Sequence, residues 1–418
     1  MTTNDRARGA LWLLLILNLL VYMTRYAPAG VLPLLEESLL GVSKQQLGYL
    51  ATVFAIVYLM GAPPFGLLGD RVRRGPLLAF GVLLSGLATA AGGLQASFGL
   101  LLVSRALTGL GQAAFVSIAP ALLSDLYPAS RRGAALGVFS IGQPVGTALS
   151  YMAGGVLVAF GLGWQGVLLV LGLPTALAGL AALRLHEPRR GACDMTTDAA
   201  EERQPMGHPW RRYLALLRNR SYLINTLAMS ANGFAMGGFA YWGPTYLHTE
   251  HGISVSMASL GFGLVTASAG AMGTLGGGAV GDRLVRRFVG GHALLSGITM
   301  LAAVPLLYVL FFSVKQPVLV WMVIGASEVL LFANTSPSLA ILMNVTAPDM
   351  RASANAFNMV VAHLLGEMFA PVIIGALADD SNMTAGLGVA AVAIGVSGLL
   401  WLLCMPFIAG DERRARGG

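Results

Sequence analysis

Long uninterrupted runs of apolar residues constrain this chain more than any other feature of its sequence. A helix rises 1.5 Å per residue, so about 20 apolar residues cross a hydrocarbon core roughly 30 Å thick. The runs reach that length twelve times. They predict spans at 10–34, 45–68, 76–96, 98–124, 133–160 and 164–186, and, after a polar segment, at 220–247, 255–280, 291–312, 317–344, 352–378 and 384–409.

The composition excludes a water-soluble fold. Charged residues make up 11% of the chain, against about 25% in an ordinary soluble domain, and hydrophobic residues make up 56%. The 54 glycines suit membrane helices, because small residues let helix backbones approach closely. The sequence therefore predicts an all-α membrane protein with a bundle of twelve transmembrane helices, and its two cysteines, Cys193 and Cys404, predict no disulfide.

The distribution of positive charge predicts the orientation. With the N-terminus inside, every one of the 26 lysines and arginines lies on the inner side except Lys44, Lys315, Arg25 and Arg105. The first two fall in outer loops and the last two fall within spans. Because inner loops carry the excess of basic residues, we expect both termini in the cytoplasm and the chain in the cell's inner membrane.

An internal repeat divides the chain into two halves. Gly69-Asp70-Arg71 after the second span returns as Gly281-Asp282-Arg283 after the eighth, and Pro128–Arg132 returns as Pro348–Arg351. Such a repeat predicts two pseudo-symmetric six-helix halves with a site near the membrane midplane. We assign 1–186 and 220–410 to the halves, 187–219 to a cytoplasmic linker and 411–418 to a cytoplasmic tail.

Two motifs carry a resemblance to a known superfamily. The stretch Gly66–Gly75 (GLLGDRVRRG) resembles the loop between the second and third helices of major facilitator transporters, and Arg105–Gln112 (RALTGLGQ) is similar to their fourth-helix motif. Carboxylates beside arginines at helix ends form charge-assisted hydrogen bonds that can latch helices in one conformation. The predicted gating residues are Asp70, Arg71, Arg74, Asp125, Asp282 and Arg283.

A narrower resemblance extends along nearly the whole chain. The segments that carry it are 18–26 (NLLVYMTRY), 31–33 (VLP), 65–71 (FGLLGDR), 118–126 (IAPALLSDL) and 363–367 (HLLGE), the last followed by Pro371 and Gly375. They are similar to the spinster branch of the superfamily. That resemblance implies alternating access and an amphipathic lipid substrate of the lysophospholipid or sphingoid type.

Two positions depart from the spinster pattern. Thr24 stands where the family usually has an acid just before the first-helix arginine, and Gln112 stands where it has a fourth-helix glutamate. Those acids are the proton carriers that the resemblance implies. Since neither Thr24 nor Gln112 titrates, the usual coupling mechanism is in question.

Ionisable groups inside a membrane are costly and usually functional. Arg25 and Arg105 both lie in the outer half of their spans, where two guanidinium groups would suit one anionic headgroup. The alternative is an internal salt bridge to Glu328 or Glu367. The predicted substrate-binding residues are Arg25, Arg105, Tyr22, Gln112, Trp242, Asn334 and Asn358, within a wider polar set that adds Tyr26, Asn225, Asn232, Tyr241 and Asn355.

The acids and histidines that lie away from the ends of the spans are all in the second half. They are Glu328, His363 and Glu367, and any proton coupling would rest on them. The spacing of His363 and Glu367 puts them on one helix face, where burial favours a shared proton. A structural ion pair is the alternative. We favour weak proton dependence through Glu367, followed by an uncoupled facilitator.

Other classes of function find no support in the motifs. The sequence has no His-Glu-x-x-His pair, no serine elbow, and no Gly-rich phosphate loop ending in Lys, so we predict no enzyme, cofactor, metal or nucleic-acid partner. We expect a monomer. An organic-anion or drug permease, and a lipid receptor that does not transport, remain as alternatives.

The orientation predicts the accessibility of Cys193. An impermeant thiol reagent applied to intact cells should leave Cys193 unlabelled, because the arginines around it keep the linker inside. Labelling should appear once the cells are permeabilised. Rapid labelling of intact cells would reverse the orientation.

Overall fold

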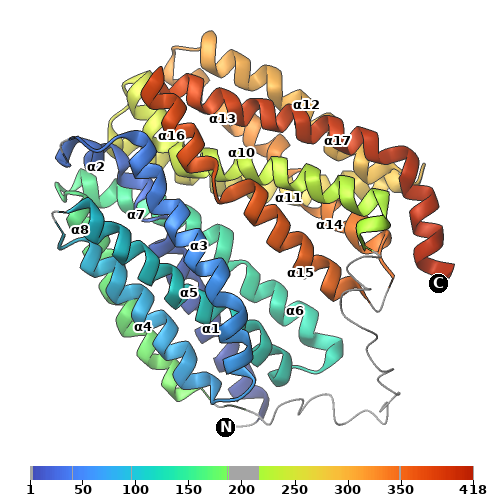
Figure 1. Cartoon of the computed structure of the whole chain (residues 1–418), viewed down its shortest axis with the longest axis horizontal. Coiled ribbons are helices and arrows are strands. Elements are labelled where there is room, and N and C mark those ends of the chain that lie inside the picture. Colours follow the sequence, from blue (N-terminus) through green and yellow to red (C-terminus); the bar gives the residue numbers. More distant parts are fainter. Residues whose placement is uncertain are drawn as a thin grey trace. The chain divides into compact units, whose positions relative to one another are not determined.

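The computed structural model describes residues 3–39, 41–95, 97–185, 187, 216–347 and 350–417, and these residues form helices and no β-strand (Figure 1). In this part of the chain, ten helices are long and apolar enough to cross a membrane. The two other predicted spans correspond to α10 (Arg220–His251) and to α6 (Ala129–Ser140) with α7 (Gly142–Ala159). The predicted all-α membrane fold is confirmed.

The chain divides into two compact units. Unit 1 comprises Met1–Glu202 and Gly252–Leu264, and unit 2 comprises Arg203–His251 and Val265–Gly418. The beginning of α11 (Val255–Val285) therefore packs with unit 1, and its remainder packs with unit 2. The boundaries that the sequence predicts for the two halves stay a prediction, and most of the predicted linker, 188–215 with Cys193, lies outside the described residues.

Unit 1 is built on α5, which packs along α3 and α4, while α4 also packs along α8 and α1 packs along α7. Ser43 begins α3 with a capping box, in which its hydroxyl accepts from the N–H of Gln46 and the Gln46 side chain accepts from the N–H of Ser43. The bounds are α1 (Thr3–Tyr26), α2 (Leu32–Ser38), α3 (Lys44–Gly69), α4 (Arg74–Gly92), α5 (Phe98–Leu126) and α8 (Trp164–Gly179), with 3₁₀ turns at Ala29–Val31 and Leu180–Arg184.

The fifth predicted span of unit 1 is broken between α6 and α7 at Ile141. Pro144 explains the break, because it has no N–H to donate to the carbonyl of Ser140 one turn earlier. The fifth span thus consists of two helical segments, α6 and α7.

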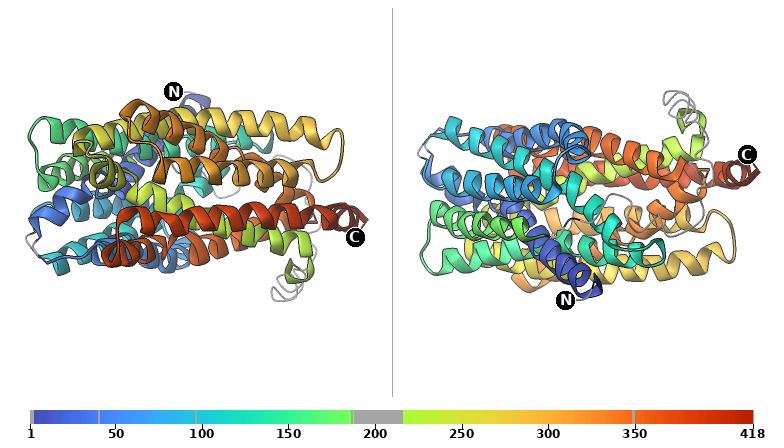
Figure 2. Two further views of the ribbon diagram at one scale, coloured as in Figure 1. Left: turned by 90° about the horizontal axis from the view of Figure 1, so that it is seen from above. Right: turned by 90° about the horizontal axis from the view of Figure 1, so that it is seen from below.

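Unit 2 is built on α10 and α17 (Met383–Gly417), which pack along each other. In Figure 2, α17 is the long helix that ends at the C mark, and it also packs along α12 (Gly291–Phe312). The other bounds are α13 (Pro317–Phe332), α14 (Thr335–Asn344), α15 (Arg351–Ala362), a π-helical turn (His363–Glu367) and α16 (Ala370–Asp380).

The internal repeat is visible in the hydrogen bonds of the two units. In unit 1 the Nε of Arg132 donates to the carbonyl of Ser124, at 3.1 Å. In unit 2 the Nε of Arg351 donates to the carbonyl of Met343, at 3.0 Å. Each arginine thus reaches back eight residues to the end of the preceding helix. The second echo in the sequence therefore reflects the same local structure in both units.

Close approach of backbones explains several glycines in the spans. In unit 2, a Cβ at Gly277 of α11 would overlap the main chain of Ala333, whereas a Cβ at the neighbouring Gly276 would meet nothing within 4 Å. Gly277 is buried and Gly276 is exposed. Only the first of these two glycines is required by packing.

This pair of glycines gives a matched test of the packing. Gly277→Ala should lower the free energy of unfolding by about 1 to 3 kcal/mol, because the methyl group forces α11 away from Ala333. Gly276→Ala should raise it by about 0.5 kcal/mol, because alanine favours the helix. Apparent unfolding temperatures of the detergent-solubilised variants measure both effects, and equal shifts would contradict the packing of α11.

Candidate functional site

The C-terminal end of α1 presents carbonyls that need partners. The last four carbonyls of a helix have no intrahelical donor, and Pro28 has no N–H to offer to the carbonyl of Thr24. Arg105 of α5 supplies donors from its guanidinium group. Its Nη1 donates to the carbonyl of Thr24 at 3.3 Å, and its Nη2 donates to the carbonyl of Arg25 at 2.9 Å. Arg105 therefore caps α1 from a neighbouring helix.

Gln112 extends this cap by two turns along α5. Its Nε2 lies 2.9 Å from the carbonyl of Val21 and 3.3 Å from the hydroxyl of Thr24 and from the hydroxyl of Ser85. Gln112 is 2% exposed and Thr24 is fully buried. The two positions that depart from the spinster pattern thus form one neutral hydrogen-bonded pair.

Arg25 lies among aromatic rings. The carbon of its guanidinium group is 5.0 Å from the ring centroid of Phe54, 5.1 Å from that of Tyr58, 5.5 Å from that of Tyr22 and 5.9 Å from that of Tyr26. Cations within about 6 Å of a ring face are attracted by its quadrupole. These four rings, which we call the aromatic cage, come from α1 and α3. The side chain that they surround is half-buried.

The two predicted arginines share one neighbour and differ in their surroundings. The guanidinium group of Arg105 lies 4.9 Å from the ring of Phe54, which Arg25 also contacts. Arg105 is only 4% exposed and two of its nitrogens are bonded to main-chain carbonyls. The structure therefore brings the two arginines together. Contact of Arg105 with substrate stays a prediction, and its present bonds hold α1.

The predicted lining residues of unit 2 lie in helix contacts. Trp242 is fully buried and its Nε1 donates to the carbonyl of Pro371 at 2.9 Å. Asn334 donates to the carbonyl of Leu331 at 2.6 Å, and Asn358 donates to the sulfur of Met229 at 3.4 Å. Both asparagines are at most 2% exposed. Their predicted contact with substrate stays a prediction, and the bonds that the structure shows lie within unit 2.

The three predicted coupling residues differ sharply in burial. Glu328 of α13 is 9% exposed, and its Oε1 accepts from the hydroxyl of Thr266 at 2.9 Å. His363 and Glu367 lie on the π-helical turn, with side chains 34% and 37% exposed, and His363 Nε2 is 3.5 Å from Glu367 Oε2. The latter pair contacts as its spacing predicts. Irregular turns of this kind are frequent at functional sites.

The predicted gating residues of unit 1 include one formed ion pair. Arg74 at the start of α4 pairs with Asp125 near the end of α5. The N–H of Arg74 also lies 3.0 Å from both carboxylate oxygens of Glu187, which thereby caps α4. Asp70 and Arg71 are exposed at the end of α3. In unit 2, Asp282 and Arg283 are likewise exposed at the end of α11. The gating role of all six stays a prediction.

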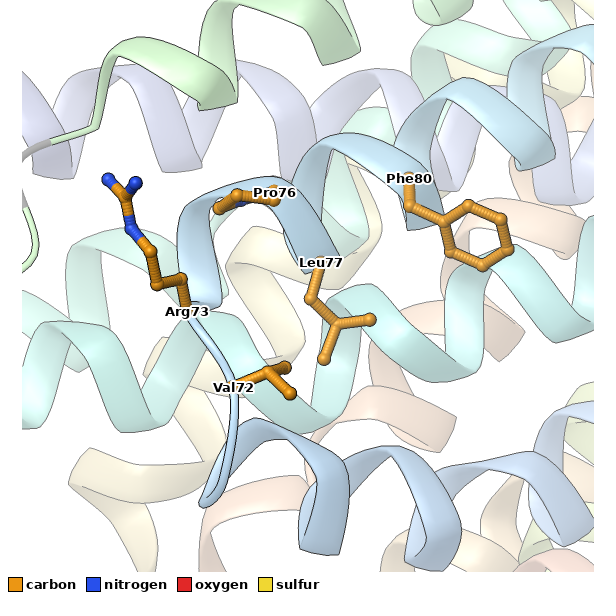
Figure 3. A pocket seen from close by; sticks show the side chains of 5 residues that line it. All are labelled: Val72, Arg73, Pro76, Leu77 and Phe80. Atoms are coloured by element: carbon orange, nitrogen blue, oxygen red, sulfur yellow. The ribbon is translucent and has the colours of Figure 1, made fainter.

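A shallow groove of about 340 Å³ lies directly after the predicted gating residues Asp70 and Arg71 in the chain. It is lined by Val72, Arg73, Pro76, Leu77 and Phe80. Figure 3 shows the guanidinium group of Arg73 turned away from the apolar side chains. The groove lies at the start of α4, and none of the residues that line it belongs to the aromatic cage.

Some residues of this site escaped the sequence analysis. Phe54 and Tyr58 are one turn apart in the second span, a spacing that puts them on one helix face and that could have marked them. Nothing in the sequence marks Thr266 as the partner of Glu328, or Glu187 as the cap of α4.

Comparison with known proteins identifies the class to which this fold and site belong. The model of the Major Facilitator Superfamily matches residues 14–366, and the chain therefore belongs to that superfamily of membrane transporters. It is a member of the spinster branch. Over 386 residues it is 33% identical to protein spinster homolog 1 of Xenopus laevis, covering 88% of this chain and 72% of that protein. The predicted superfamily and branch are both confirmed.

A second relative and one solved structure add to this assignment. Over 384 residues the chain is 33% identical to the sphingosine-1-phosphate transporter SPNS2 of Danio rerio, covering 87% of this chain and 74% of that protein. A crystal structure of a bacterial homolog to the human lysosomal transporter spinster, in an inward-facing and unoccupied conformation, matches with a TM-score of 0.83 at 20% identity. The match covers 98% of this chain and 97% of the other. The chain thus has the fold of a transporter of this superfamily.

The different surroundings of the two arginines predict different costs of substitution. Arg105→Lys should lower the free energy of unfolding by about 2 kcal/mol, because an ammonium group cannot bond both carbonyls as the planar guanidinium does. Arg25→Lys should cost about 1 kcal/mol or less, because a lysine retains attraction to the aromatic cage. Unfolding temperatures in one detergent provide the comparison, and a larger cost for Arg25→Lys would contradict the assignment.

Proposed function

We propose that this transporter carries an amphipathic lipid with an anionic headgroup, of the lysophospholipid or sphingoid-phosphate type. The observation that carries the proposal is Arg25, a half-buried guanidinium group in an aromatic cage beside the capped end of α1. A guanidinium group suits bidentate contact with phosphate, and the rings suit the apolar part of a lipid next to its headgroup. The names of its relatives, above all the sphingosine-1-phosphate transporter of Danio rerio, support the same class of substrate.

The roles of the two arginines follow from their bonds. Arg25 binds the headgroup, whereas Arg105 is a positioning residue that holds the end of α1. Gln112 acts with Arg105, since it bonds the carbonyl of Val21 one turn earlier. The headgroup site therefore rests on a buried scaffold that does not itself titrate.

We further propose that the chain resides in the cell's inner membrane as a monomer, with both termini in the cytoplasm. The bias of basic residues toward one side supports this orientation. Opening on that side involves the predicted gating residues, of which Arg74 and Asp125 already form a pair. The protein acts without enzymatic chemistry, and a proton gradient drives transport through a carboxylate of the second half.

Two other functions give different binding profiles. An organic-anion or drug permease would bind small anions or cationic drugs without a lipid tail. A non-transporting receptor would bind the lipid without moving it. A binding screen of lysophospholipids, sphingoid phosphates, sugar phosphates and cationic drugs separates the permease from the lipid transporter.

The headgroup role of Arg25 predicts a change in selectivity. Arg25→Ala should weaken binding of anionic lipids by roughly tenfold or more, because one charge-assisted contact is lost. Zwitterionic and cationic lipids should bind nearly as before. Arg73→Ala removes the same charge from the groove at the start of α4 and serves as the matched control. Equal weakening of every lipid by Arg25→Ala would show that Arg25 is structural.

A further inference from the structure

Glu328 is a deeply buried acid within a span of unit 2. It lies on the apolar helix α13 and is only 9% exposed. Oε1 accepts from Thr266, but Oε2 is sealed from solvent and has no hydrogen-bond partner among the described residues. A buried polar atom without a partner is costly and requires an explanation.

Neither α11 nor α12, the two helices of unit 2 seen to pack against α13, places a cation beside Glu328. α13 packs against α12 and against α11, where Gly273 meets Val329. The only titratable side chains on these helices, besides Glu328, are Asp282 and Arg283 at the far end of α11 and His292 and Tyr308 on α12.

None of these four side chains faces the carboxylate. Asp282 and Arg283 are about 16 residues beyond Thr266 along α11, which corresponds to roughly 24 Å. The ring of His292 lies against Gly281 at that same end. Tyr308 is 63% exposed and points away from the packed interior. An ionised Glu328 would therefore be a buried charge without compensation in unit 2, which costs several kcal/mol.

We propose that Glu328 is the residue that binds and releases the coupling proton, an inference that rests on the proposed transport function. In this structure Oε2 carries the proton, and Thr266 stabilises the neutral acid by donating to Oε1. When water on one side reaches Oε2, the proton leaves to that water. It is replaced from the water on the opposite side after the conformational change. One proton crosses per cycle, and no other group is oxidised, reduced or transferred.

The sequence favours Glu367 for this role, but its surroundings differ from those of Glu328. Its carboxylate lies 3.5 Å from His363, and both side chains are about one-third exposed. Unlike Oε2 of Glu328, the carboxylate of Glu367 is therefore neither sealed nor without a partner in this structure. Glu367→Gln becomes the matched control for Glu328→Gln.

The protonation itself can be measured without any substrate. Infrared difference spectra of the reconstituted protein, recorded while the pH is raised, should contain a C=O band from a protonated carboxyl group. The band should be missing from Glu328→Gln and present in Glu367→Gln. Thr266→Val, which keeps the carboxyl group but removes its donor, should shift the band. A band that persists in Glu328→Gln, or the absence of any such band in the parent, would overturn the proposal.

Flux in proteoliposomes tests the coupling. A pH gradient should drive accumulation of lysophospholipid in the parent and in Glu367→Gln, whereas Glu328→Gln should lose accumulation and retain exchange at equal concentrations. Accumulation that survives in Glu328→Gln, or that follows a sodium gradient instead, would overturn the role of Glu328. If the parent moves no lipid at all, the proposed substrate fails, and the infrared result still decides the protonation of Glu328.

Discussion

The contact of Arg105 with the end of α1 is the interaction on which the candidate site depends. A helix that ends inside a membrane leaves carbonyls that cannot turn to water, and each would cost several kcal/mol if unpaired. Pro28 has no N–H to donate to the carbonyl of Thr24. The guanidinium group of Arg105 donates to that carbonyl and to the carbonyl of Arg25. The end of α1 is thereby fixed, and Arg25 is fixed with it among the rings of the aromatic cage.

Thr24 and Gln112 form a neutral pair, so these two positions cannot carry the proton in energy coupling. The resemblance to the spinster branch implies acids at these two positions, and in this chain they hold α1 to α5 through an amide and a hydroxyl. The bonds of Gln112 to α1 thus involve no titratable side chain. If a proton drives transport, it must act in unit 2, where Glu328 has the burial and the missing partner that such a role requires.

The sequence predicted the fold well and the site unevenly, for physical reasons. Apolar runs longer than a bilayer is thick leave few alternatives to spanning helices, so the fold class followed directly. Arg25 and Arg105 stood out because charges are rare in spans, and the structure places both guanidinium groups beside the ring of Phe54. Their different roles depend on which groups surround them, and Phe54 reaches Arg25 only through tertiary packing. Burial likewise separates Glu328 from Glu367, although both lie in apolar runs of similar composition.

Net movement of a lipid across a sealed membrane tests the central claim most directly, since binding alone is shared by a transporter and a receptor. Proteoliposomes loaded with radiolabelled sphingosine phosphate or lysophospholipid are placed in medium containing albumin, which captures the lipid that emerges. The account predicts efflux that saturates with lipid concentration and exceeds efflux from protein-free vesicles. Tight binding of the same lipids with efflux no faster than from protein-free vesicles would contradict it.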